Sequence, residues 1–158
     1  MSVDRSDVAA FLDALRAAES AGADVLTAWV AVCGLDELRG GLRAIAEREA
    51  VHAELLADRL RELGVPCTAT VNELLRATAV SRFGSRDLAD EEKLTLVLAR
   101  YPDDGTVTRP ITRMMESLDR DPETRELLRL VAEGESATIA WFRAYQRALG
   151  RRVPPPAA

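Results

Sequence analysis

The sequence has few aromatic residues, few cysteines and a single histidine. Phe, Trp and Tyr together make up 4% of the 158 residues, and Cys33 and Cys67 are the two cysteines. Two cysteines specify neither a disulfide framework nor a zinc–cysteine site. No apolar run approaches membrane-spanning length, and the amino terminus lacks the basic-then-apolar pattern of a signal peptide. We therefore expect a cytoplasmic protein with reduced thiols and no membrane partner.

Charge and motifs exclude further classes of function. The formal net charge of −5 argues against a general affinity for nucleic acid. A Gly-rich phosphate loop, a nucleophile elbow and a CxxC motif are all absent. Ala, Leu, Arg and Glu dominate the sequence, and this composition favours helices over strands. We expect an all-α domain over residues 1–150, followed by a disordered tail at 151–158.

The pattern of apolar residues, caps and breakers predicts four long helices. The first begins near Asp7, with Ser6 as its cap, and a tight turn at 34–36 folds the second helix back against it. Residues 65–87 form a long connection. A third helix from Leu88 is broken by a Pro-Asp-Asp-Gly segment at 102–105 and restarts behind Thr108 and Pro110. The fourth helix runs from Pro122 to Gly150.

The lone histidine, His52, lies on an otherwise apolar helical face together with Glu49. Their spacing of three directs both side chains to the same side of a helix. A carboxylate and an imidazole that point into a core require an ion pair or a metal ion. Either a buried salt bridge or a metal site would satisfy the pair. Glu19 interrupts the apolar face of the first helix in the same way.

The second and fourth helices read as two copies of one unit. An offset of 86 residues gives ten identities over the 28 positions from 37 to 64, without a gap. Helical periodicity alone would match apolar positions, but the offset also pairs Glu49 with Glu135 at a core position. Two helix pairs and a long connection predict a four-helix bundle with one long crossover and a broken third helix.

These features resemble the ferritin-like superfamily, nearest to the rubrerythrin and bacterioferritin type, over nearly the whole chain. The family pattern has a Glu on helices one and three and a Glu-x-x-His motif on helices two and four. Glu19, Glu49 with His52, and Glu135 match it. The histidine expected on helix four is Thr138, and the glutamate expected on helix three is Gly105.

The two losses fall on the same half of the family's two-metal centre. By the resemblance, Glu19, Glu49, His52 and Glu135 would hold one ion, while the second ion has lost both of its terminal ligands. Asp103 or Asp104 could reach inwards from the broken helix, although nothing in the sequence requires it. Such a donor set suits iron or manganese, and zinc as well. A single ion would permit oxidoreductase chemistry on dioxygen, peroxide or another small molecule.

Several alternatives remain open at this stage. The carboxylates could be a metal-free remnant that shares protons around His52, in a bundle that binds a partner or a second copy of itself as a homodimer. They could also perform acid–base catalysis without a metal. The break at 102–110 is either a degenerate loop or an opening beside the site, with Tyr101 near its mouth. The arginine-rich face at 39–48 is expected to be solvated.

Overall fold

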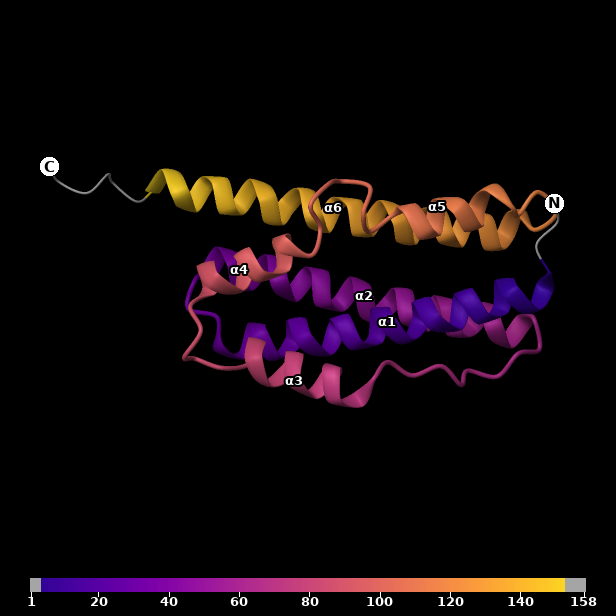
Figure 1. The fold of residues 1–158 in the computed structure, drawn as a ribbon, viewed down its shortest axis with the longest axis horizontal. Coiled ribbons are helices and arrows are strands. Elements are labelled where there is room, and N and C mark those ends of the chain that lie inside the picture. The colour runs from indigo at the N-terminus through magenta and orange to yellow at the C-terminus, as the bar shows by residue number, and fades with distance from the viewer. Residues whose placement is uncertain (1–3, 153–158) are drawn as a thin grey trace, which may run out of the picture.

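The computed structural model describes residues 4–152, and in that range the chain is all-helical, as the composition predicts. Figure 1 shows long helices lying side by side, with shorter helices packed along them. The six helices found there are α1 (Arg5–Val32), α2 (Asp36–Glu62), α3 (Glu73–Phe83), α4 (Asp90–Ala99), α5 (Arg109–Glu116) and α6 (Pro122–Arg152).

Helices α1 and α2 form an antiparallel hairpin (Figure 1). The predicted start of α1 is corrected by two residues, because Asp4, and not Ser6, is the N-cap: its side chain accepts a hydrogen bond from the backbone N–H of Ser6. Helix α2 ends as predicted near Gly64, whose φ of +73° lies in the left-handed region. The N–H of Val65 then donates to the carbonyl of Leu60 at 2.9 Å, closing the helix in the manner of a glycine C-cap.

The chain returns along α1 through an extended segment and then α3 (Figure 1). Asp13 holds this segment against α1, because its buried carboxylate accepts from the backbone N–H groups of Thr68 at 2.7 Å and Ala69 at 2.6 Å. These bonds, together with Arg16, lower the pKa of Asp13 although burial acts against them. The segment that follows α2 is therefore anchored to α1 by a charged group that would be unstable without its donors.

Helices α4 and α5 follow one another along α6 and are separated by turns at residues 100–108, where the sequence predicts the break (Figure 1). Pro110 lies in the first turn of α5, a position that needs no N–H donor. Thr108 occupies the N-cap position as predicted, but its side chain makes no capping hydrogen bond. The break thus comes from the Pro-Asp-Asp-Gly segment and not from a strong new cap.

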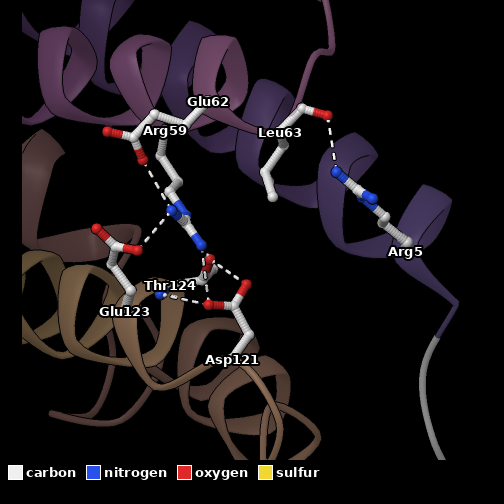
Figure 2. Close-up of polar contacts among 7 residues, drawn as sticks. All are labelled: Arg5, Arg59, Glu62, Leu63, Asp121, Glu123 and Thr124. Atoms are coloured by element: carbon white, nitrogen blue, oxygen red, sulfur yellow. Dashed lines mark hydrogen bonds and ion pairs between the residues drawn. The ribbon is translucent and has the colours of Figure 1, made fainter.

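An arginine joins the end of α2 to the start of α6, as Figure 2 shows. The Arg59 guanidinium forms ion pairs with Glu62 at 2.7 Å, Glu123 at 2.8 Å and Asp121 at 3.0 Å. Its Nε also donates to the hydroxyl of Thr124 at 2.9 Å. Asp121 in turn accepts from the Thr124 N–H, which would otherwise be an unsatisfied donor of the first turn of α6.

Two apolar clusters lie towards opposite ends of the long helices. One includes Leu12, Leu56 and Leu128, and the other includes Leu26, Leu42 and Phe142. On each of α1, α2 and α6 the two clusters are separated by the stretch that carries the predicted metal ligands. A polar layer therefore interrupts the core at mid-length.

Helix α6 continues to Arg152, two residues beyond the predicted domain boundary. The rest of the predicted tail, residues 153–158, lies outside the described residues. Among the helices of residues 4–152, none combines the length and apolar character needed to cross a membrane.

Candidate metal centre

Three long helices bring the predicted ligands to the polar layer. Glu19 comes from α1, Glu49 and His52 from α2, and Glu135 from α6. The side chains are withdrawn from solvent: Glu19 is 5% exposed, Glu49 9% and His52 3%. Glu135 is half-buried. Burial of this many ionisable groups in one layer requires compensation by protons, by hydrogen bonds or by a cation.

Three of the four residues form a compact group. One ligand atom from each of Glu19, His52 and Glu135 lies within 4.8 Å of the other two. His52 Nδ1 is 3.0 Å from Glu19 Oε2. Glu135 Oε1 is buried and has no hydrogen-bond partner among the described residues. A carboxylate oxygen in that condition is available to a cation.

Glu49 lies outside this compact group and packs against α1. A β-carbon placed on Gly22 would be 2.2 Å from Glu49 Oε2, so only glycine at that position allows the carboxylate to lie where it does. Burial, followed by the negative charges of Glu135 and Glu19, raises the pKa of Glu49 to about 9. Without a metal, Glu49 therefore carries a proton at neutral pH.

Burial and the charges of nearby carboxylates also raise the pKa values of Glu135 and Tyr101. Burial and then the charge of Glu19 raise the pKa of Glu135, while His52 and Arg48 act in the opposite direction. Tyr101, at the start of the break between α4 and α5, is half-buried. Burial raises the pKa of its phenol, and the charges of Glu135, Glu49 and Glu19 raise it further. Tyr101 is therefore coupled electrostatically to all three carboxylates.

Neither aspartate of the break belongs to the cluster. Asp103 is exposed and pairs with Arg109 at 2.9 Å, and Asp104 is exposed and pairs with Arg143. Thr138, which stands where the repeat would place a histidine, is 5% exposed, and its hydroxyl donates to the carbonyl of Gly134 at 3.1 Å. The side of the layer that faces Thr138 thus has no titratable ligand of its own.

Arg48 also belongs to this layer, contrary to the prediction that the arginine-rich face at 39–48 is solvated. It was expected on a solvated face, but it is half-buried, and its Nη2 donates to the Gly134 carbonyl at 2.9 Å and to the Thr138 hydroxyl. A signal was present in the sequence, because Arg48 precedes His52 by four residues and so shares its side of α2. Several arginines lie close together in this part of α2, and such a cluster is typical of a solvated face.

The residues present fit a single divalent cation. The three ligand atoms lie within 4.8 Å of one another, and ligand atoms that share one ion at bond lengths of about 2.0–2.2 Å are separated by no more than roughly 4.4 Å. Carboxylate and imidazole donors suit iron, manganese or zinc. Glu49 would complete the set only after releasing its proton. None of the known protein families, curated proteins or solved structures compared with this chain matches it.

Proposed function

We propose that this protein is a ferritin-like four-helix bundle that binds one transition-metal ion through Glu19, Glu49, His52 and Glu135. The observation that carries the proposal is the convergence of Glu19, His52 and Glu135 from three helices to within 4.8 Å of one another. The buried Glu135 Oε1, which lacks a hydrogen-bond partner among the described residues, supports it.

The proposed bundle takes α1, α2 and α6 as three of its helices and α4 with α5 as the broken fourth. The segment from the end of α2 through α3 is then the long crossover. The internal repeat gives independent support. Helix α2 begins at Asp36 and α6 at Pro122, and these positions differ by 86 residues, the same offset that aligns their sequences.

Iron or manganese is the metal we propose, with zinc as a competitor for the same donors. When bound, iron or manganese would supply a one-electron couple and a Lewis acid for dioxygen, peroxide or another small molecule. The chain supplies apolar clusters on either side of the layer and a half-buried phenol, Tyr101, whose pKa the carboxylates raise. We therefore propose a non-haem oxidoreductase activity for the loaded protein.

Metal binding must displace protons from the cluster. Glu49, whose pKa is raised to about 9, and Glu135, whose pKa is also raised, have to ionise before they can act as ligands. The apparent affinity for the metal therefore rises with pH over the neutral range.

The proposal is tested by measuring the metal content of untagged protein reconstituted with Fe²⁺, Mn²⁺ or Zn²⁺ and then desalted. We expect close to one equivalent in the wild type and a loss of at least tenfold in His52→Ala. The control is Glu47→Ala, which removes an exposed carboxylate from the same helix and should leave the content unchanged. Less than a tenth of an equivalent in the wild type, or equal contents in wild type and His52→Ala, would contradict the proposal.

A metal-free bundle that acts as an interaction module is the second candidate. The observation in its favour is that Glu49 carries its own proton at neutral pH, so that the layer can persist without a cation. In that case Glu49→Gln should retain or raise the melting temperature, and added metal should not change it. A metal-dependent centre would instead be stabilised by the ion in the wild type and less so in Glu49→Gln.

The setting we propose is cytoplasmic. Cys33 is buried, Cys67 is exposed, and both are free thiols in the structure. An exposed free thiol is typical of a reducing compartment. A homodimer formed through a helix face stays a prediction.

A further inference from the structure

Arg48 is held inside the contact between α2 and α6. Its Nη2 donates to two acceptors on α6, the Gly134 carbonyl at 2.9 Å and the Thr138 hydroxyl. Its Nε is buried and has no hydrogen-bond partner among the described residues. A half-buried guanidinium with an unpaired donor is unfavourable unless nearby negative charge compensates for its lost hydration.

The compensating charge comes from the metal-ligand layer. Arg48 lowers the pKa of both Glu49 and Glu135, opposing the effect of burial on each. The hydrogen bonds described for its guanidinium nevertheless go to a carbonyl and a hydroxyl, and not to these carboxylates. Arg48 therefore contributes positive charge to the layer while leaving the carboxylate oxygens free to bind a metal.

The two copies of the internal repeat differ at the positions of Arg48 and His52, which are occupied by other residues on α6. The offset of 86 pairs His52 with Thr138 and Arg48 with Gly134. A β-carbon at Gly134 would lie 3.2 Å from Arg48 Nε and 2.6 Å from His52 Cε1, so the absence of a side chain there admits both groups from α2. On α6, the position equivalent to His52 is therefore Thr138, whose hydroxyl accepts a hydrogen bond from the Arg48 guanidinium.

We propose that Arg48 is a built-in counter-cation that takes the place of a second metal ion on the Thr138 side of the layer and limits the centre to one divalent ion. The one-ion limit rests on the proposed function, whereas the role of Arg48 as a counter-charge does not. Arg48 precedes Glu49 in α2, and the carbonyl that its guanidinium binds belongs to Gly134, the residue before Glu135. A fixed unit charge at this place repels a second divalent ion that would use the same two carboxylates. Arg suits this role because its planar guanidinium carries a delocalised charge and is more weakly hydrated than an ammonium group.

The first experiment counts bound Co²⁺ by equilibrium dialysis and by visible absorption. Wild type and Thr138→His are each expected to bind one equivalent. Arg48→Gln/Thr138→His is expected to bind two, because the new imidazole is added and the positive charge is removed. Arg48→Lys/Thr138→His is the matched control, which keeps the charge and should bind one.

The outcomes separate this inference from the proposed function. Two equivalents in Thr138→His alone, or one in a folded Arg48→Gln/Thr138→His, would overturn the one-ion limit. No Co²⁺ in the wild type would overturn the proposed function, and the one-ion limit with it, and would leave the counter-charge to be judged by a metal-free measurement.

The metal-free measurement is a double-mutant cycle in which melting temperatures are determined at pH 8 in the presence of a chelator. Arg48→Gln should lower the melting temperature of the wild type by several degrees, at roughly 2–4 °C per kcal/mol for a chain of this size. In a Glu49→Gln/Glu135→Gln background, which lacks the two carboxylates whose pKa Arg48 lowers, the same change should lower the melting temperature by less than half as much. Equal losses in the two backgrounds would show that Arg48 is only a structural hydrogen-bond donor and would overturn the inference.

Discussion

Gly134 illustrates how a single missing side chain allows the polar layer to form. The imidazole of His52 lies so close to α6 that a β-carbon at position 134 would be 2.6 Å from its Cε1. Glycine within a helix is less favourable than alanine by about 1 kcal/mol, because it loses more backbone freedom on folding. The close approach of His52 and Arg48 to α6 is the structural reason for accepting that loss.

We predict that Gly134→Ala destabilises the protein, although alanine is the better helix former. The clash with His52 should lower the free energy of unfolding by about 1–3 kcal/mol, as overpacking does in other cores. Gly40→Ala on α2 is the control, since a β-carbon there has nothing within 4 Å, and it should raise the free energy of unfolding by about 0.5–1 kcal/mol. Urea unfolding followed by circular dichroism measures both. Similar gains in the two variants would mean that His52 does not lie against Gly134.

At the scale of the elements, Arg59 links helices that are distant in sequence. Its side chain is 13% exposed and pairs with carboxylates from the end of α2, from the loop before α6 and from the first turn of α6 (Figure 2). Arg61, two residues further along α2, is 75% exposed, and its ion pair within residues 4–152 is with Asp58, one turn away on the same helix. The two arginines therefore provide a matched pair with different structural roles.

We expect Arg59→Met to lower the free energy of unfolding by about 2–3 kcal/mol, because hydrogen bonds to charged groups are lost and acceptors near Thr124 are left unpaired. Arg61→Met should change it by less than about 0.5 kcal/mol, since an exposed pair on one helix contributes little. Unfolding curves in urea at low and high salt measure the difference. Equal effects of the two substitutions would indicate that the junction between α2 and α6 does not depend on Arg59.

At the scale of the whole molecule, the ionisable layer makes folding dependent on pH. The pKa of Glu49 rises from an ordinary value near 4.5 to about 9 in the folded protein. The folded state therefore holds a proton that the unfolded state releases between these limits. The stabilisation from this retained proton is therefore fully present below the unfolded pKa of Glu49 and is lost as the pH rises through the folded pKa.

We predict that the metal-free protein becomes less stable as the pH is raised from 5 to 9, by at most about 1.4 kcal/mol per pH unit for each proton retained. Glu135 adds to this slope because its pKa is also raised, while the positive charge of Arg48 reduces it. Glu49→Gln, which is neutral at every pH, should have a shallower slope. The measurement is urea unfolding at several pH values in chelator. A slope in Glu49→Gln as steep as that of the wild type would show that Glu49 is ionised throughout.

Much of the helical framework could be read from local signals. The apolar periodicity, the Gly64–Pro66 stop and the break before Pro110 all depend on residues close together in the chain, and the helices that they predict are present. The sequence predicts a start of α1 near Asp7 with Ser6 as the cap, whereas Asp4 takes that role in the structure. Local chemistry indicates that a helix starts there but does not decide between two capping residues that are two positions apart.

The sequence by itself determined the all-α class, the break at the Pro-Asp-Asp-Gly segment 102–105 and the candidacy of Glu19, Glu49, His52 and Glu135. Proline and glycine mark the break locally, and periodicity reports which side of a helix a residue occupies. Only the tertiary structure decided which of these side chains meet: Glu19, His52 and Glu135 converge, while Glu49 turns towards Gly22. The tertiary structure also shows that Arg48, predicted on a solvated face, donates hydrogen bonds to α6 within the polar layer. The physical reason is that the distance between helices depends on glycines of the facing helix, and periodicity within one helix carries no information about them.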